Sequence, residues 1–68
     1  MYDKIQLAGE HVLLVWTIAP EGKPLERWQI YREAIRDDGQ NIDGGVVDGA
    51  RAGAIEVGKS VARSLGLA

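Results

Sequence analysis

The chain has 68 residues, with ten acidic and eight basic side chains and a formal net charge of −2. A chain of this length has room for one small domain, whose thin apolar core leaves it only marginally stable. The absence of cysteine excludes a disulfide framework, a thiolate metal site and a cysteine nucleophile. We therefore expect a single domain over residues 1–68, stabilised in part by association with a second copy or a partner.

The hydropathy pattern is that of a folded protein without a membrane span. A hydrophobic fraction of 46% with mixed charge argues against disorder. The longest apolar run, Val12 to Trp16, is much shorter than the roughly 18 residues that a membrane span needs. Polar residues interrupt the N-terminal segment, so it does not resemble a signal peptide. We expect a cytoplasmic protein that does not associate with membranes.

Two strands are predicted in the first third of the chain. Residues 12–18 are rich in β-branched and aromatic side chains and lie between two turn signals, which is typical of a strand. Ile5 and Leu7 alternate with polar residues and predict a short edge strand, joined to the first through a turn at Gly9. Because residues 12–18 are apolar on both faces, we expect a helix over one face and loops or a second subunit over the other.

The segment 25–36 has two interpretations, and the architecture depends on the choice. The dipeptide Asp38-Gly39, with apolar residues on both sides, is a strong hairpin signal and favours a strand. As a strand, the segment directs Trp28 to one face and Tyr31 to the other. The alternative is a second helix at 24–37.

Residues 49–65 are predicted to form a C-terminal helix, with Asp48 as its N-cap and Gly66 as its left-handed C-cap residue. At helical spacing one apolar stripe contains Ala50, Ala54, Ile55, Val57, Val61, Ala62 and Leu65. Gly53 and Gly58 leave a low surface that another backbone can approach closely. The order of elements predicts an α+β fold, a small antiparallel meander of three to four strands packed against one C-terminal helix.

One segment matches the phosphate-binding P-loop pattern. Gly53 to Ser60 has two glycines five positions apart, followed by Lys and Ser. Ile55 and Val57 resist the backbone angles that such a loop needs, and Glu56 would place a negative charge beside the phosphates. The same residues satisfy the amphipathic helix, so we expect a helix interior and no nucleotide cofactor.

The polar residues do not predict a metal site or a catalytic centre. The aspartates lack the alternating spacing of a calcium loop, and they suit turns and a helix cap instead. They are Asp37, Asp38, Asp43 and Asp48, of which Asp43 precedes Gly44-Gly45 in a predicted turn. His11 is the only histidine, so a two-histidine metal site is excluded. We expect no metal, no cofactor, no catalytic residue and no enzymatic activity.

Aromatic and arginine side chains are the best candidates for binding a partner. They are Trp16, Arg27, Trp28, Tyr31, Arg32 and Arg36. Because Trp, Tyr and Arg are enriched at protein–protein hot spots, the sequence predicts a non-catalytic protein-interaction module or a homo-oligomer, such as a homodimer. The same side chains can stack on bases and neutralise phosphates. A small nucleic-acid-binding module is therefore the alternative, although the net negative charge disfavours it.

Overall fold

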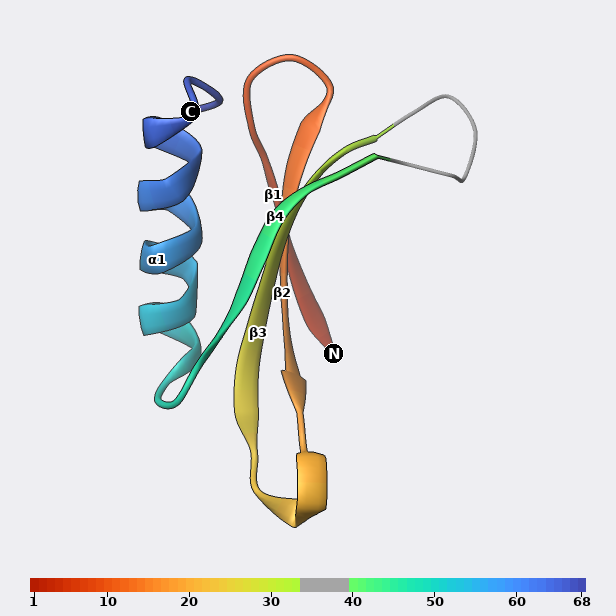
Figure 1. The fold of residues 1–68 in the computed structure, drawn as a ribbon, viewed down its shortest axis with the longest axis vertical. Helices are drawn as coiled ribbons and strands as arrows, with labels where there is room; N and C mark the ends of the chain where they lie inside the picture. The colour runs from red at the N-terminus through yellow and green to blue at the C-terminus, as the bar shows by residue number, and fades with distance from the viewer. Residues whose placement is uncertain (34–39) are drawn as a thin grey trace.

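The protein has two layers, a four-stranded antiparallel sheet and one helix (Figure 1). The computed structural model describes residues 1–33 and 40–68. Its elements are β1 (Tyr2–Gln6), β2 (His11–Ile18), a short 3₁₀ helix (Pro20–Gly22), β3 (Leu25–Arg32), β4 (Gln40–Val47) and α1 (Arg51–Ser64). This arrangement confirms the predicted α+β fold, with four strands in the meander.

The strands follow one another across the sheet in the order β1-β2-β3-β4, and each pairs antiparallel with the next. Residues 25–32 pair along both edges, as β3, so the alternative of a second helix is wrong for these residues. Their period-two alternation of buried and exposed side chains suits a strand between two neighbours. The predicted Asp38-Gly39 turn lies outside the described residues.

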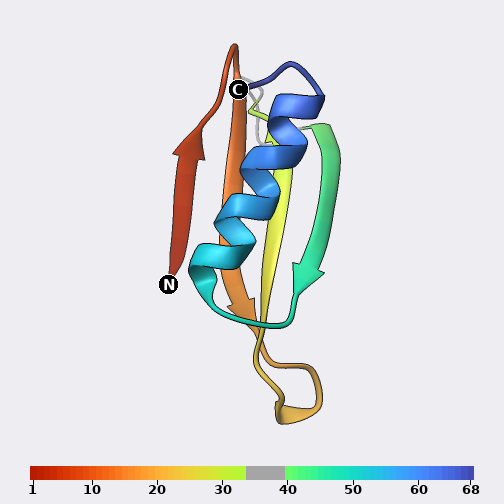
Figure 2. The ribbon, with the colours of Figure 1, turned by 90° about the vertical axis from the view of Figure 1, so that its left-hand side faces the viewer.

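Helix α1 lies diagonally across one face of the sheet (Figure 2). The buried residues between the two layers are Leu13, Val15, Trp28, Ile30, Ala54 and Ala62. Gly58 faces Leu13, and a Cβ atom at Gly58 would stand 2.6 Å from Leu13 Cδ1. The prediction that another backbone approaches closely is wrong at Gly58, because the approaching group is the side chain of Leu13. It is also wrong for Gly53, which meets nothing within 4 Å.

The predicted N-terminus of the helix needs correction. Ala50 is the N-cap residue and makes no side-chain hydrogen bond there. Asp48 is not the N-cap. It is exposed and lies 3.9 Å from Lys23 in an ion pair. The apolar stripe is also rotated from its predicted position, because Gly58 is buried while Val57 is 40% exposed and Leu65 is exposed.

The predicted C-cap is confirmed. Gly66 has a φ angle of 76°, in the left-handed region that favours glycine. The amide of Leu67 donates to the carbonyl of Ala62 at 2.8 Å, and the amide of Gly66 donates to Arg63 at 3.1 Å. These two bonds form the Schellman motif.

The P-loop match, Gly53 to Ser60, lies inside α1, as the helix interpretation predicted.

The predicted turn at Asp43-Gly44-Gly45 is wrong, because these residues lie inside β4. A Cβ atom at Gly45 would stand 3.0 Å from the indole of Trp28, and one at Gly44 would stand 3.2 Å from the Trp28 carbonyl oxygen. The glycines therefore leave room for the neighbouring strand and its tryptophan.

No helix in the described part of the chain is long and apolar enough to cross a membrane.

Candidate interaction surface

The face of the sheet opposite α1, called the open face below, is not covered by any helix or strand of residues 1–33 and 40–68 (Figure 1). Side chains alternate along each strand, and directly paired residues share a face. The open face therefore contains Tyr2, Lys4, Gln6, Val12, Leu14, Trp16, Ile18, Leu25, Arg27, Gln29, Tyr31, Asn41, Gly44 and Val46. Of these, Val12 is fully buried. The most exposed aromatic side chain of the open face is Tyr2, at 62%.

The register arranges the open face in rows that run across the strands. One row is Tyr2, Trp16, Arg27 and Val46, and the next is Lys4, Leu14, Gln29 and Gly44. In the first row, the Arg27 guanidinium carbon lies 5.9 Å from the centroid of the Trp16 ring. This distance is within the range of a cation–π interaction. The row thus offers aromatic surface and a cation side by side.

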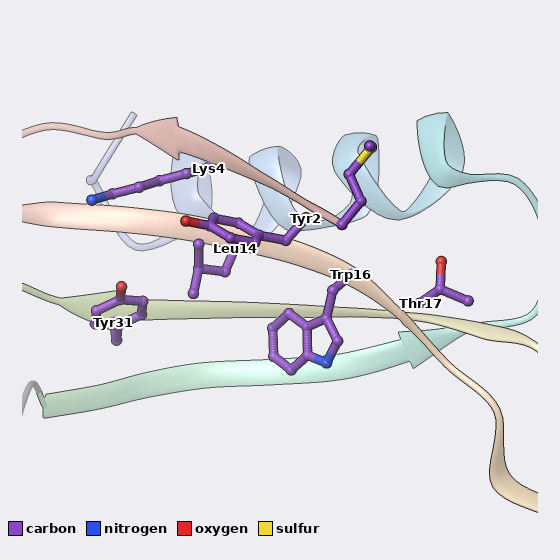
Figure 3. Close-up of a pocket in the computed structure, with 7 residues that line it drawn as sticks. Tyr2, Lys4, Leu14, Trp16, Thr17 and Tyr31 are labelled. Atoms are coloured by element: carbon purple, nitrogen blue, oxygen red, sulfur yellow. The ribbon is translucent and has the colours of Figure 1, made fainter.

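A hollow of about 420 Å³ lies on the open face beside these residues. Figure 3 shows Leu14 between Trp16 and Tyr31, with Tyr2 and Lys4 over the neighbouring strand. The lining residues are Met1, Tyr2, Lys4, Leu14, Trp16, Thr17 and Tyr31. The hollow is wide open to solvent, so it suits a side chain of a docked macromolecule better than a small molecule held alone.

The open face carries charges of both signs. Lys4 Nζ donates to Glu33 Oε2 at 2.8 Å, across the width of β2. This hydrogen bond, and then the charge of Glu33, raises the pKa of Lys4. Gln29 Nε2 donates to Asn41 Oδ1 at 3.1 Å. Polar groups at the rim of an apolar centre are typical of a protein interface.

The structure separates the six residues that the sequence offered as partner-binding candidates. Trp16 and Tyr31 lie half-buried on the open face, and Arg27 is exposed there. Trp28 is only 6% exposed and belongs to the core under α1. Its side chain is therefore not available to a partner in this fold.

The two remaining candidates do not add to the open face. Arg32 Nη2 lies 3.4 Å from Glu10 Oε2, in an exposed pair at the end of the sheet. Arg32 lies four residues after Trp28 on the same strand, so both side chains are on the α1 side of β3. Arg36 lies outside the described residues.

A second polar cluster joins the start of α1 to the face of the sheet that α1 covers. Arg51 Nη1 donates to Asp3 Oδ2 and its Nη2 to Thr17 Oγ1, both at 2.9 Å, while its Nε donates to Glu26 Oε1. Thr17 Oγ1 donates in turn to Glu26 Oε2 at 2.7 Å. Glu26 is 7% exposed. The hydrogen bonds from Arg51 and then Thr17 hold the pKa of Glu26 below its ordinary value.

This cluster holds the helix in place. Arg51 bonds to each of the other three side chains, Asp3, Thr17 and Glu26, and no buried side-chain nitrogen or oxygen in the described residues lacks a partner. The cluster therefore anchors the first turn of α1 to β1, β2 and β3.

Sequence reasoning missed Tyr2, Lys4 and Leu14 as parts of the hollow, and Arg51 as the centre of the polar cluster. Lys4 lies beside Leu14 and Tyr2 beside Trp16 because of the register of β1 against β2. Strand alternation predicts these neighbours only when that register is known. Nothing local to Arg51 signals its three partners, which lie 25 to 48 positions away along the chain.

The described residues contain no group of three or more His, Asp or Glu side chains placed to hold a metal ion. Comparison of the chain with protein-family models, with curated proteins and with solved structures found no significant match.

Proposed function

We propose that the protein is a non-catalytic interaction module that associates with a second copy of itself through the open face. The observation that carries this proposal is the pair of half-buried aromatic side chains, Trp16 and Tyr31, beside the exposed Tyr2 on a sheet face that no described element covers. Aromatic surface of this kind in a small soluble chain is typical of an interface.

The thin core supports self-association. Among the described residues, the largest fully buried side chains between the sheet and α1 are Leu13, Val15 and Ile30. A core of this size gives a chain of 68 residues little stability of its own, and burial of a second apolar layer adds to it. Two sheets that stack by one face each produce a sandwich with an apolar interior about 10 Å thick.

The area of the open face sets the expected strength of the association. The face is about 26 Å long and about 19 Å wide, or roughly 450 Å² per copy after allowance for the shorter β1. Stable interfaces bury about 800 Å² per partner, so this one belongs to the small class. We expect a dissociation constant in the micromolar range.

Sedimentation equilibrium at up to several hundred micromolar protein tests the proposal. The wild-type chain is expected to dimerise, and Trp16→Ala is expected to weaken the dimer at least about tenfold, because tryptophan anchors typically contribute 2 kcal/mol or more. Val57→Ala is the matched control, since Val57 is exposed on α1. Circular dichroism checks that each variant is folded. A monomeric wild type over this range refutes the proposal.

A second candidate function is binding of single-stranded nucleic acid by the same face. It is favoured by one observation: Arg27, Trp16 and Tyr31 share the open face, while Asp3 and Glu26 point to the other. Base stacking on aromatic side chains near cations is typical of such platforms. The aliphatic side chains of Ile18, Leu25 and Val46 favour the protein interface instead.

Fluorescence anisotropy with a labelled oligothymidine separates the two functions. Nucleic-acid binding predicts an affinity that falls steeply between 50 and 200 mM salt, with slopes of the size known for phosphate contacts. Self-association through an apolar face predicts a much weaker dependence on salt. Absence of binding at low salt removes the second candidate.

A further inference from the structure

We infer that the second copy docks about a two-fold axis that runs parallel to the strands, between β2 and β3. The inference rests on the proposed self-association and adds its geometry. Two stacked sheets can be related by an axis along the strands, which places β1 over β4 of the second copy. They can also be related by an axis across the strands, which places β1 over β1 of the second copy.

The relief of the open face distinguishes these two arrangements. The edge formed by β1 carries the large side chains Tyr2 and Lys4. In the rows of Tyr2 and Lys4 the edge formed by β4 is lower, because it presents Val46 and Gly44 there. Asn41 of β4 lies in the next row, across the sheet from Gln6. Gly44 cannot become larger without moving the backbone, since a Cβ atom there would stand 3.2 Å from the carbonyl oxygen of Trp28. In the rows of Tyr2 and Lys4 one edge is therefore high and the other is low.

Only the axis along the strands places a high edge over a low edge in both halves of the dimer. The axis across the strands stacks β1 on β1, which leaves a wedge of empty space between the two β4 strands. Interfaces reach packing densities close to those of protein interiors, so an arrangement with an even separation is strongly favoured.

The pairs that result from the axis along the strands are also chemically matched. Each row faces the same row of the second copy, running in the opposite direction across the strands. Trp16 therefore lies over Arg27 of the second copy, and Tyr2 lies over Val46 of the second copy. Lys4 lies over Gly44 of the second copy, which leaves space for its ion pair with Glu33. In these rows no cation faces a cation. The existing contact of Arg27 with Trp16 is thus repeated between the two copies.

A mixing experiment with two variants tests the axis. One protein carries Trp16→Arg and the other carries Arg27→Glu, and native mass spectrometry measures the equilibrium between two homodimers and one heterodimer. Independent sites give a constant of 4 for this exchange. The inferred axis places Arg at 16 directly over Glu at 27, so we expect the constant to rise at least about tenfold.

The matched control replaces Trp16→Arg with Gln6→Arg, which adds the same charge two rows away. It corrects for attraction between oppositely charged subunits in general. A constant no higher for Trp16→Arg than for Gln6→Arg overturns the inferred axis, and the proposed self-association stands if the wild type dimerises. A monomeric wild type overturns both.

Crosslinking provides a measurement that does not depend on Trp16 variants. The chain has no cysteine, so single cysteines at the exposed positions Tyr2→Cys and Val46→Cys are unique. The inferred axis places these two positions about 10 Å apart in different copies, whereas two copies of position 2 are about 17 Å apart. A bis-maleimide with a span of about 10 Å is expected to link the mixture and to link Tyr2→Cys alone poorly. The reverse result overturns the inference.

Discussion

Replacing Gly58 by alanine tests how closely α1 approaches the sheet. The added Cβ atom would stand 2.6 Å from Cδ1 and 2.8 Å from Cδ2 of Leu13. Leu13 is fully buried between its neighbours, so its methyl groups have little room to move. The helix or the leucine must shift, and such overpacking typically costs 1–3 kcal/mol.

The substitution also has a favourable effect, because alanine stabilises a helix interior by about 1 kcal/mol relative to glycine. Gly53→Ala isolates this effect, since a Cβ atom at Gly53 meets nothing within 4 Å. We expect Gly53→Ala to raise the free energy of unfolding by up to about 1 kcal/mol. Gly58→Ala is expected to lower it, by about 1 kcal/mol after both effects are combined.

Urea unfolding followed by tryptophan fluorescence measures both variants at one protein concentration, so that association affects them equally. The difference between the two variants, about 1–3 kcal/mol, is free of the helix-propensity effect. In addition, Leu13→Ala should cost less in the Gly58→Ala protein than in the wild type, because the residues are in contact. Equal stabilisation by Gly53→Ala and Gly58→Ala would refute the close approach.

Three further predictions follow from individual contacts. Gly45→Ala should destabilise the protein by about 1–3 kcal/mol in the same unfolding assay, because its Cβ atom would stand 3.0 Å from the Trp28 indole; an unchanged midpoint contradicts this. Hydrogen bonds from Arg51 lower the pKa of Glu26, so the stability they confer is full above about pH 5 and is lost as the pH falls through the lowered pKa. Glu26→Gln should therefore flatten the dependence of the urea midpoint on pH between 5 and about 3, and an unaltered slope contradicts that role. Asp48→Ala should change the free energy of unfolding by less than about 0.5 kcal/mol, whereas loss of a true N-cap costs about 1 kcal/mol.

Local patterns determined much of this fold in advance. Three elements are predicted by patterns among residues close together in the chain. These patterns are the β-branched run of β2, the alternation in β1 and the apolar periodicity of α1. Gly66 ends the helix for an equally local reason, its left-handed backbone angle. The alternation along β3 also separates Trp28 from Tyr31 correctly, since it depends only on the period of a strand.

Tertiary contacts decided the rest. Both faces of β2 are apolar, so the sequence does not say which one the helix covers. Gly58 and Gly45 decide it, because they leave space for Leu13 and Trp28 on the same side of the sheet. Gly44 and Gly45 look like a turn signal along the chain, but in the sheet they lie beside Trp28 of the neighbouring strand, whereas Gly58 lies where the helix meets the sheet. Trp28 thus became a core residue, and Trp16 and Tyr31 remained on the open face, where a second copy is proposed to bind.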